Sequence, residues 1–211
     1  MTLRARQLSC VRGTRTLFDS VALELSAGDA LRVTGANGRG KSSLLRILCG
    51  LALPEEGQVF WQGCDIREVR SEFTRALLYL GHAAAIKADL SAVENLLTAS
   101  ALAGTPVKAS TAYRALETAG LASVADLPCR LLSQGQHKRV ALARLHLARD
   151  AHLWVLDEPF SSLDAESAQD LVSTLDRHLV RGGILVYTTH QDVAPKAWRS
   201  RMLDLDAQTA C

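Results

Sequence analysis

The stretch ALRVTGANGRGKSSLLRILCG, Ala30 to Gly50, decides the fold class. An apolar strand leads into Gly35–Ser42, which matches the pattern GxxxxGK[ST], and a helical segment follows directly. Glycines in such a loop let backbone N–H groups surround a polyphosphate, and the helix N-terminus adds its dipole. Lys41 is expected to reach the β- and γ-phosphates of a nucleotide, and Ser42 to bind Mg²⁺. An ordinary glycine turn is the alternative, but strand and helix stand where a phosphate loop needs them.

Strands are predicted on both sides of this loop. VALEL at Val21–Leu25 alternates in polarity and GQVFWQG at Gly57–Gly63 is bounded by glycines, which favours an antiparallel sheet. HLWVLDEP at His152–Pro159 and GGILVYTTH at Gly182–His190 are nearly continuous apolar runs, typical of central parallel strands. Polar residues end both runs, at the edge where open parallel sheets bind ligands.

The region between these strands, from about residue 90 to residue 150, has a helical pattern. SAVENLLTASALAG begins at Ser91, and Glu94 three residues later completes the pattern of a capping box. Gly104 is expected to end this helix. A second helix is predicted from residue 111 to Gly120 and a third after Leu132, so the region forms an all-helical insert.

Composition limits the function classes. The chain has 211 residues, 48% of them hydrophobic, and a net charge of +2 from 24 basic and 22 acidic residues. This balance gives no indication of a nucleic-acid partner. Five scattered cysteines form no CxxC pair, which excludes the common zinc patterns and suits a reducing compartment. No apolar run reaches the roughly 18 residues of a spanning helix, and the N-terminus lacks the apolar core of a secretory signal.

The polar ends of the two apolar runs are candidates for catalysis. Asp157 and Glu158 end a buried strand, where carboxylates are costly unless they meet a cation or a proton donor. Asp157 is predicted to bind Mg²⁺ through water, and Glu158 to act as the general base on an attacking water. His190 could contact the γ-phosphate and hold that water. The alternative is that these residues simply end strands at the solvent.

A second helix start resembles an anion site. LSQGQHKRVALAR, Leu132 to Arg144, places a glycine among hydroxyl and amide side chains before a basic helix. The Ser133 hydroxyl and the Gly135 N–H can both donate to a phosphate, and a glycine permits a close approach that a Cβ would block.

In this order, the phosphate loop, LSQGQ, LWVLDEP, SSLD at Ser161–Asp164 and TTH resemble the motifs of ATP-binding cassette (ABC) ATPases. The resemblance implies an α/β P-loop NTPase with a mixed sheet core, an antiparallel β subdomain and a helical subdomain. It implies one domain over residues 1–211, with a catalytic lobe at about 1–81 and 151–211 and a helical lobe at about 82–150. It also implies a head-to-tail homodimer in which the signature turn of each copy meets ATP held by the other. The nucleotide-binding residues are then expected to be Gly35, Ala36, Asn37, Gly38, Arg39, Gly40, Lys41, Ser42, Ser43, Arg12, Ser133, Gly135, Gln136 and Asp164, the last coupling the two sites.

The chain departs from the family pattern at three positions. Arg12 stands where an aromatic residue usually stacks on adenine; it could stack through its guanidinium, or it could be a solvated loop residue. His82 replaces a glutamine that contacts Mg²⁺ and water; it could bind either, or it could be a hydrogen-bonded residue without a catalytic part. Gln134 replaces the usual glycine of the signature.

Within the family, LGHAAAIK, VFWQG, LDEPFSSLD and GGILVYTTHQ look most like the ATPase subunits of cytochrome c maturation systems. That likeness implies a peripheral protein at the cytoplasmic face of a bacterial inner membrane. It also implies integral-membrane permease subunits of a haem export system as partners, with haem involved only indirectly and no nucleic acid.

Three other functions stay open at this point. The chain could serve another ABC transporter with a lipid, peptide or metal cargo. It could be a non-transport ABC ATPase acting on nucleic acid or the ribosome, although such proteins usually carry a second cassette or basic arms. It could also be a nucleotide-binding regulator without turnover, against which Glu158 and His190 count.

Overall fold

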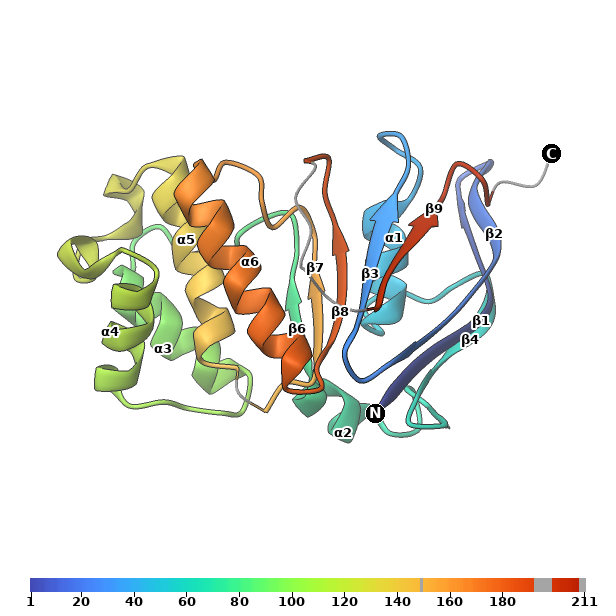
Figure 1. Cartoon of the computed structure of the whole chain (residues 1–211), viewed down its shortest axis with the longest axis horizontal. Helices are drawn as coiled ribbons and strands as arrows, with labels where there is room; N and C mark the ends of the chain where they lie inside the picture. Colours follow the sequence, from blue (N-terminus) through green and yellow to red (C-terminus); the bar gives the residue numbers. More distant parts are fainter. Residues whose placement is uncertain (149, 192–198, 209–211) are drawn as a thin grey trace. The chain divides into compact units, whose positions relative to one another are not determined.

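The computed structural model describes residues 1–148, 150–191 and 199–208. Two compact units make up the chain (Figure 1). The sheet unit comprises Met1–His82, Ala151–Pro159 and Val172–Cys211, and the helical unit comprises Ala83–Asp150 and Phe160–Leu171. Phe160–Leu171 thus packs with the helical unit, although the sequence prediction assigned it to the catalytic lobe. Cys211, one of the five cysteines of the sequence, lies outside the described residues.

A five-stranded parallel sheet is the centre of the sheet unit, with the strand order β6-β7-β8-β3-β9. Its strands span Leu77–Leu80 (β6), Leu153–Leu156 (β7), Ile184–Thr188 (β8), Asp29–Thr34 (β3) and Arg199–Asp204 (β9). Every residue of β7 and β8 is buried. This burial explains their continuous apolar sequences, because a central parallel strand is covered on both faces.

A separate antiparallel sheet has the order β2-β1-β4-β5. Its strands span Thr2–Arg12 (β1), Arg15–Ser26 (β2), Glu56–Trp61 (β4) and Cys64–Asp65 (β5). The predicted VALEL and GQVFW strands both lie in this sheet. Parallel and antiparallel pairing therefore occur in two different sheets of the described chain, which refines the prediction of a mixed sheet core.

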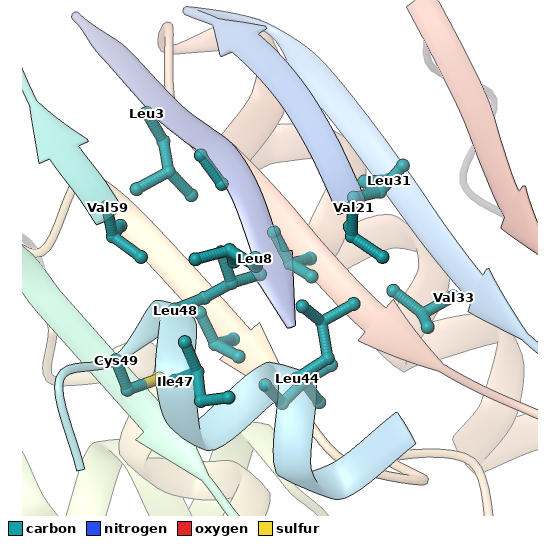
Figure 2. Close-up of a cluster of buried hydrophobic side chains, with 14 of the residues drawn as sticks. Leu3, Leu8, Val21, Leu31, Val33, Leu44, Ile47, Leu48, Cys49 and Val59 are labelled. Carbon is teal, nitrogen blue, oxygen red and sulfur yellow. The ribbon is translucent and has the colours of Figure 1, made fainter. Parts of the chain in front are cut away.

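Helix α1 (Lys41–Leu48) links the two sheets through a common hydrophobic core (Figure 2). Leu44, Ile47 and Leu48 point from α1 into a cluster that contains Leu8 of β1 and Val33 of β3. Each of these five side chains is almost completely buried. Because α1 begins at the phosphate loop, this packing fixes the end of the loop.

A buried histidine supports the parallel sheet at β7. The His178 ring stacks on Trp154 with a centroid separation of 3.9 Å, and its Nε2 lies 3.2 Å from the Ile184 carbonyl oxygen. Burial lowers the pKa of His178 to about 4, so the ring is neutral at physiological pH. Position 183 is a glycine because a Cβ there would overlap the His178 ring.

The helical unit contains α3 (Ala92–Leu102), α4 (Ala109–Thr118) and α5 (Gln134–Ala143), with short 3-10 turns at Ala122–Val124, Cys129–Leu131 and Arg144–His146. Figure 1 shows these three helices gathered together. Ser91 and Glu94 form the predicted capping box at the start of α3. Helix α6 (Ala165–Val180) begins in this unit and continues into the sheet unit, and α2 (Arg70–Ala76) precedes β6.

In the described part of the chain, no helix has both the length and the apolar character that crossing a bilayer requires. Cys10, Cys49, Cys64 and Cys129 are free thiols.

Candidate nucleotide-binding and hydrolysis site

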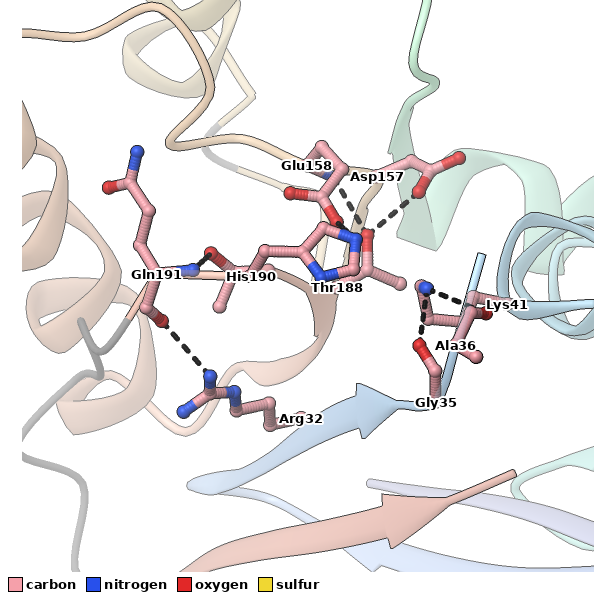
Figure 3. A network of polar contacts seen from close by, with 10 residues as sticks. Arg32, Gly35, Ala36, Lys41, Asp157, Glu158, Thr188, His190 and Gln191 are labelled. Atoms are coloured by element: carbon pink, nitrogen blue, oxygen red, sulfur yellow. Dashed lines mark hydrogen bonds and ion pairs between the residues drawn. The ribbon is translucent and has the colours of Figure 1, made fainter. Parts of the chain in front are cut away.

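The phosphate loop, Gly35–Ser42, joins β3 to α1. Gly40 is the N-cap of α1 and has φ of 96°, a conformation that favours glycine. No side chain of the described residues caps this helix, so the first N–H groups of α1 are available to an anion. The Lys41 Nζ donates to the carbonyl oxygens of Gly35 at 2.7 Å and Ala36 at 3.3 Å (Figure 3). The lysine amine therefore lies beside the first residues of the loop, and its contact with the phosphates of a nucleotide stays a prediction.

The carboxylates after β7 form a connected polar group (Figure 3). The Thr188 hydroxyl donates to the Asp157 Oδ1 at 2.7 Å and accepts from the Glu158 N–H at 2.8 Å. The His190 Nε2 lies 3.4 Å from the Glu158 Oε1. Asp157 is only 4% exposed, and Glu158 has a positive φ of 50°, which is unusual for a residue other than glycine. The arrangement fixes the Asp157 carboxylate through Thr188 and brings the Glu158 carboxylate close to the His190 ring.

Strand pairing brings this polar group and the phosphate loop to one edge of the parallel sheet. Val33, two residues before the loop, pairs with Thr188 across β3 and β8. The Asp157 N–H donates to the Leu80 carbonyl oxygen at 2.8 Å, so β6 also ends at this edge. His82 follows two residues after Leu80 and is exposed. The sequence prediction of a common ligand edge is consistent with this register.

Thr188 is a site residue to which the sequence reasoning gave no role. Its hydroxyl is buried between the two carboxylate residues, and it links Asp157 to the Glu158 backbone. The signal in the sequence was a threonine at the polar end of an otherwise apolar strand, two residues before the histidine that the prediction did select.

The signature turn, Leu132–Gln136, begins α5 in the helical unit. Ser133 is the N-cap: its hydroxyl accepts from the Gln136 N–H at 3.2 Å, and the Gln136 side chain accepts from the Ser133 N–H at 2.8 Å. The motif is therefore a capping box, which the spacing S-x-x-Q could have revealed. The Gly135 Cα approaches the SSLD loop so closely that a Cβ would lie 3.2 Å from the Ser162 carbonyl oxygen. The predicted donors are present, but part of this turn already bonds to itself.

Asp164, predicted to couple two nucleotide sites, caps α6 in this structure. Its Oδ1 accepts from the Ser167 N–H at 2.8 Å. Hydrogen bonding to Ser167 lowers the pKa of the Asp164 carboxyl, and the charge of Arg139 acts in the same direction. The coupling role stays a prediction.

Two predicted nucleotide contacts, Arg12 and Arg39, have different surroundings. Arg12 is exposed at the end of β1 and pairs with Arg15 across the β1–β2 hairpin. The Arg39 Nε donates to the Asp206 carboxylate at 2.6 Å. Ser43 is buried in the first turn of α1. Arg12 thus retains access to a ligand, whereas Arg39 already has a partner.

Residues 18–161 match the family described as ABC transporter. The chain belongs to the ABC transporter family. This ABC protein is 50% identical to the "cytochrome c biogenesis ATP-binding export protein CcmA" of Aromatoleum aromaticum over 99% of its own length and 97% of the relative. It is 47% identical to the protein of the same name from Pseudomonas aeruginosa, over 92% of its own length and 95% of the relative. Membership in the family makes it a nucleotide-binding protein that couples ATP hydrolysis to transport.

The fold of this ABC protein also matches solved cassettes. A dimeric ATP-binding cassette bound to ADP and Pi has a TM-score of 0.83 and 23% identity, and the match covers 96% of this chain and 94% of that cassette. The predicted fold class, an α/β P-loop ABC ATPase, is confirmed.

Proposed function

We propose that this ABC protein hydrolyses Mg-ATP within a homodimer and thereby drives the membrane subunits of a haem export system in cytochrome c biogenesis. The proposal also places it at the cytoplasmic face of a bacterial inner membrane, with haem bound by its partners and no nucleic acid involved. The observation that carries the hydrolysis is the polar group of Asp157, Thr188, Glu158 and His190 at the edge where the phosphate loop begins.

The nucleotide is bound by the phosphate loop. The uncapped N-terminus of α1 supplies backbone N–H donors, and Lys41 supplies a positive charge. In this proposal Ser42 and Asp157 hold Mg²⁺, because a buried carboxylate and a hydroxyl at the helix start suit this cation. A bound Mg²⁺ would neutralise negative charge on the β- and γ-phosphates.

Hydrolysis needs a base beside the γ-phosphate. Glu158 is the base in this proposal: it takes the proton of the attacking water, while His190, whose Nε2 lies 3.4 Å from the Glu158 Oε1, holds that water at the γ-phosphate. The backbone of Glu158 is fixed by Thr188 in a strained conformation, which restricts where the carboxylate can point. His82, exposed beyond β6, is the third candidate for contact with the water or the metal.

The partner copy completes the site in this proposal. Ser133, Gly135 and Gln136 of each copy contact ATP held by the other, and Asp164 couples the two sites. The dimeric state of the solved cassette bound to ADP and Pi supports this arrangement. The names of the relatives, cytochrome c biogenesis export proteins, support the assignment of the transport system.

The hydrolysis is tested with Glu158→Gln, which removes the base and keeps the shape of the side chain. Phosphate release should fall by about 100-fold or more, the range of a lost general base. With Mg-ATP this variant should form dimers, detected by light scattering. Glu72→Gln, an exposed residue on α2, is the matched control and should behave as the wild type. Equal turnover in wild type and Glu158→Gln would exclude the assigned base.

The transport assignment needs a separate test. A bacterium that lacks its own cytochrome c maturation ATPase should regain c-type cytochromes with the wild-type chain and not with Glu158→Gln. Active ATPase without such rescue, together with co-purification of a different permease, would assign the chain to another ABC transporter.

A further inference from the structure

A turn at the end of β9 lies against the phosphate loop. Leu205 is fully buried, and its N–H donates to the Thr34 carbonyl oxygen at 3.0 Å, at the residue that precedes the loop. The Gln208 carbonyl oxygen accepts from the Asp19 N–H of β2 at 3.1 Å. Two strands therefore anchor this turn, although it stands about 170 positions from the loop in the sequence, as the separation of Ala36 and Asp206 shows.

Between these anchors, Asp206 extends its carboxylate to two points of the loop. Its Oδ2 accepts from the Ala36 N–H at 2.9 Å, and its Oδ1 accepts from the Arg39 Nε at 2.6 Å. The Arg39 N–H in turn donates to the Ala36 carbonyl oxygen at 3.3 Å. One carboxylate thus connects the second and the fifth residues of the loop.

The bonds with Arg39 and Ala36, together with the charges of Arg39 and Lys41, lower the pKa of Asp206. The carboxylate is therefore ionised at neutral pH. Its partner in the backbone is the N–H of Ala36, at the entrance of the loop, and not the N–H groups that begin α1. Asp206 thus bonds to the loop at Ala36 and Arg39 and leaves the N–H groups that begin α1 to a ligand.

We propose that Asp206 is a positioning residue of the phosphate loop: by holding Ala36 and Arg39 together, it shapes the loop before the nucleotide arrives. This inference rests on the proposed function, because it assumes that the loop binds nucleotide. A loop that is already ordered loses less conformational entropy on binding, so the bonds of Asp206 with Ala36 and Arg39 raise nucleotide affinity. Asp206 also holds the Arg39 side chain at its Nε, whereas the Lys41 amine donates to carbonyl oxygens of the loop.

The direction in which nucleotide affinity changes when the Asp206 carboxylate is removed distinguishes a positioning role from competition with phosphate. A carboxylate that competed with phosphate would weaken binding, and its removal would raise affinity. A carboxylate that orders the loop strengthens binding, and its removal lowers affinity. Asp206→Asn removes the charge that pairs with Arg39 and nearly preserves the side-chain volume.

The first measurement is hydrogen exchange on the nucleotide-free protein. Asp206→Asn should increase exchange of the amides in residues 36–39, whereas Glu24→Gln should not. Glu24 is the matched control, since it is an exposed carboxylate paired with Arg4 at 3.5 Å on the antiparallel sheet. The melting temperature of Asp206→Asn should stay close to that of the control, because a partly exposed ion pair contributes little to global stability.

The second measurement is the dissociation constant for Mg-ADP by calorimetry. We expect it to rise about three- to tenfold in Asp206→Asn, as for the loss of one charge-assisted hydrogen bond, with little change in the maximal hydrolysis rate. Arg39→Gln breaks the same contact from the loop side and should raise the dissociation constant for Mg-ADP by a similar factor. The double variant should add little to either change, because both substitutions remove one bond.

If the wild type binds Mg-ADP and Asp206→Asn changes neither the amide exchange nor the affinity, the inference is overturned and the proposed function is kept. Tighter binding by this variant would also overturn it and would make Asp206 a competitor of phosphate. A wild type that does not bind Mg-ADP at all would overturn the proposed function and this inference with it. If Asp206→Asn does not fold, Arg39→Gln decides by the same two measurements.

Discussion

The chain has two helix starts that the sequence predicts to bind anions, and they differ in how their backbone donors are used. At the phosphate loop, α1 begins at Gly40 without a side-chain cap. At the signature turn, Ser133 and Gln136 cap α5 reciprocally, so the Gln136 N–H and the Ser133 N–H already have partners. An uncapped helix start leaves its donors for a ligand, whereas a capped start is stable by itself.

This difference indicates that the two helix starts have different roles in nucleotide binding and turnover. At the phosphate loop, the N–H groups that begin α1 have no side-chain cap in the described part of the chain, so we expect the loop to supply most of the nucleotide affinity. The signature turn retains the Gly135 N–H and the hydroxyl hydrogen of Ser133, which suit a contact with a phosphate that another site already holds. Substitutions at the two helix starts should therefore separate binding from turnover.

The largest expected effect is at the phosphate loop. Lys41→Ala should weaken ATP binding by about 100-fold, because it removes the charged donor to the phosphates. Calorimetry on the isolated subunit measures this loss. Lys108→Ala, at the start of α4 where its side chain makes no cap, is the control and should bind as the wild type does. Equal affinity in Lys41→Ala would remove the distinction between the two helix starts.

Gly40→Ala tests the backbone conformation at the N-cap of α1. Alanine is strained at φ of 96°, and its Cβ would lie 3.0 Å from the Leu17 Cβ. We expect a loss of about 2 kcal/mol in the free energy of unfolding, typical of such strain, measured by denaturant titration. Gly135→Ala should cost less than about 1 kcal/mol, because its backbone needs no positive φ and only the Ser162 carbonyl must move. A larger loss at position 135 would contradict this contrast.

Ser133→Arg should lower hydrolysis by about tenfold or more, because a large side chain blocks the close approach of a phosphate. ATP binding to the isolated subunit should stay within about twofold of the wild type. Lost binding in the isolated subunit would show that the signature turn acts on the nucleotide of its own chain.

The smallest effect is expected from Ser133→Ala, which removes only the cap of α5. The free energy of unfolding should fall by about 1 kcal/mol, the usual value of an N-cap. Ser91→Ala, at the matching capping box of α3, is the reference and should cost a similar amount. A change in thermal stability at position 91 but none at 133 would indicate that the signature cap is held in place by other contacts.

The sequence alone determined the elements whose signals are local. The phosphate loop is a fixed pattern between a strand and a helix, and the capping box at Ser91 and Glu94 spans four residues. Continuous apolar runs identified β7 and β8 because burial on both faces leaves no polar alternation. The order of these motifs along the chain also identified the family.

Only the tertiary structure decided which distant residues meet. The link from Thr188 to Asp157 depends on the pairing of β7 with β8, and the bond from Asp206 to Ala36 depends on β9 lying beside β3. Neither contact leaves a periodic signal, because side chains far apart in sequence are brought together by strand order. A local pattern reports the backbone conformation of its own segment, whereas the partner of a polar side chain is set by the packing of the whole sheet.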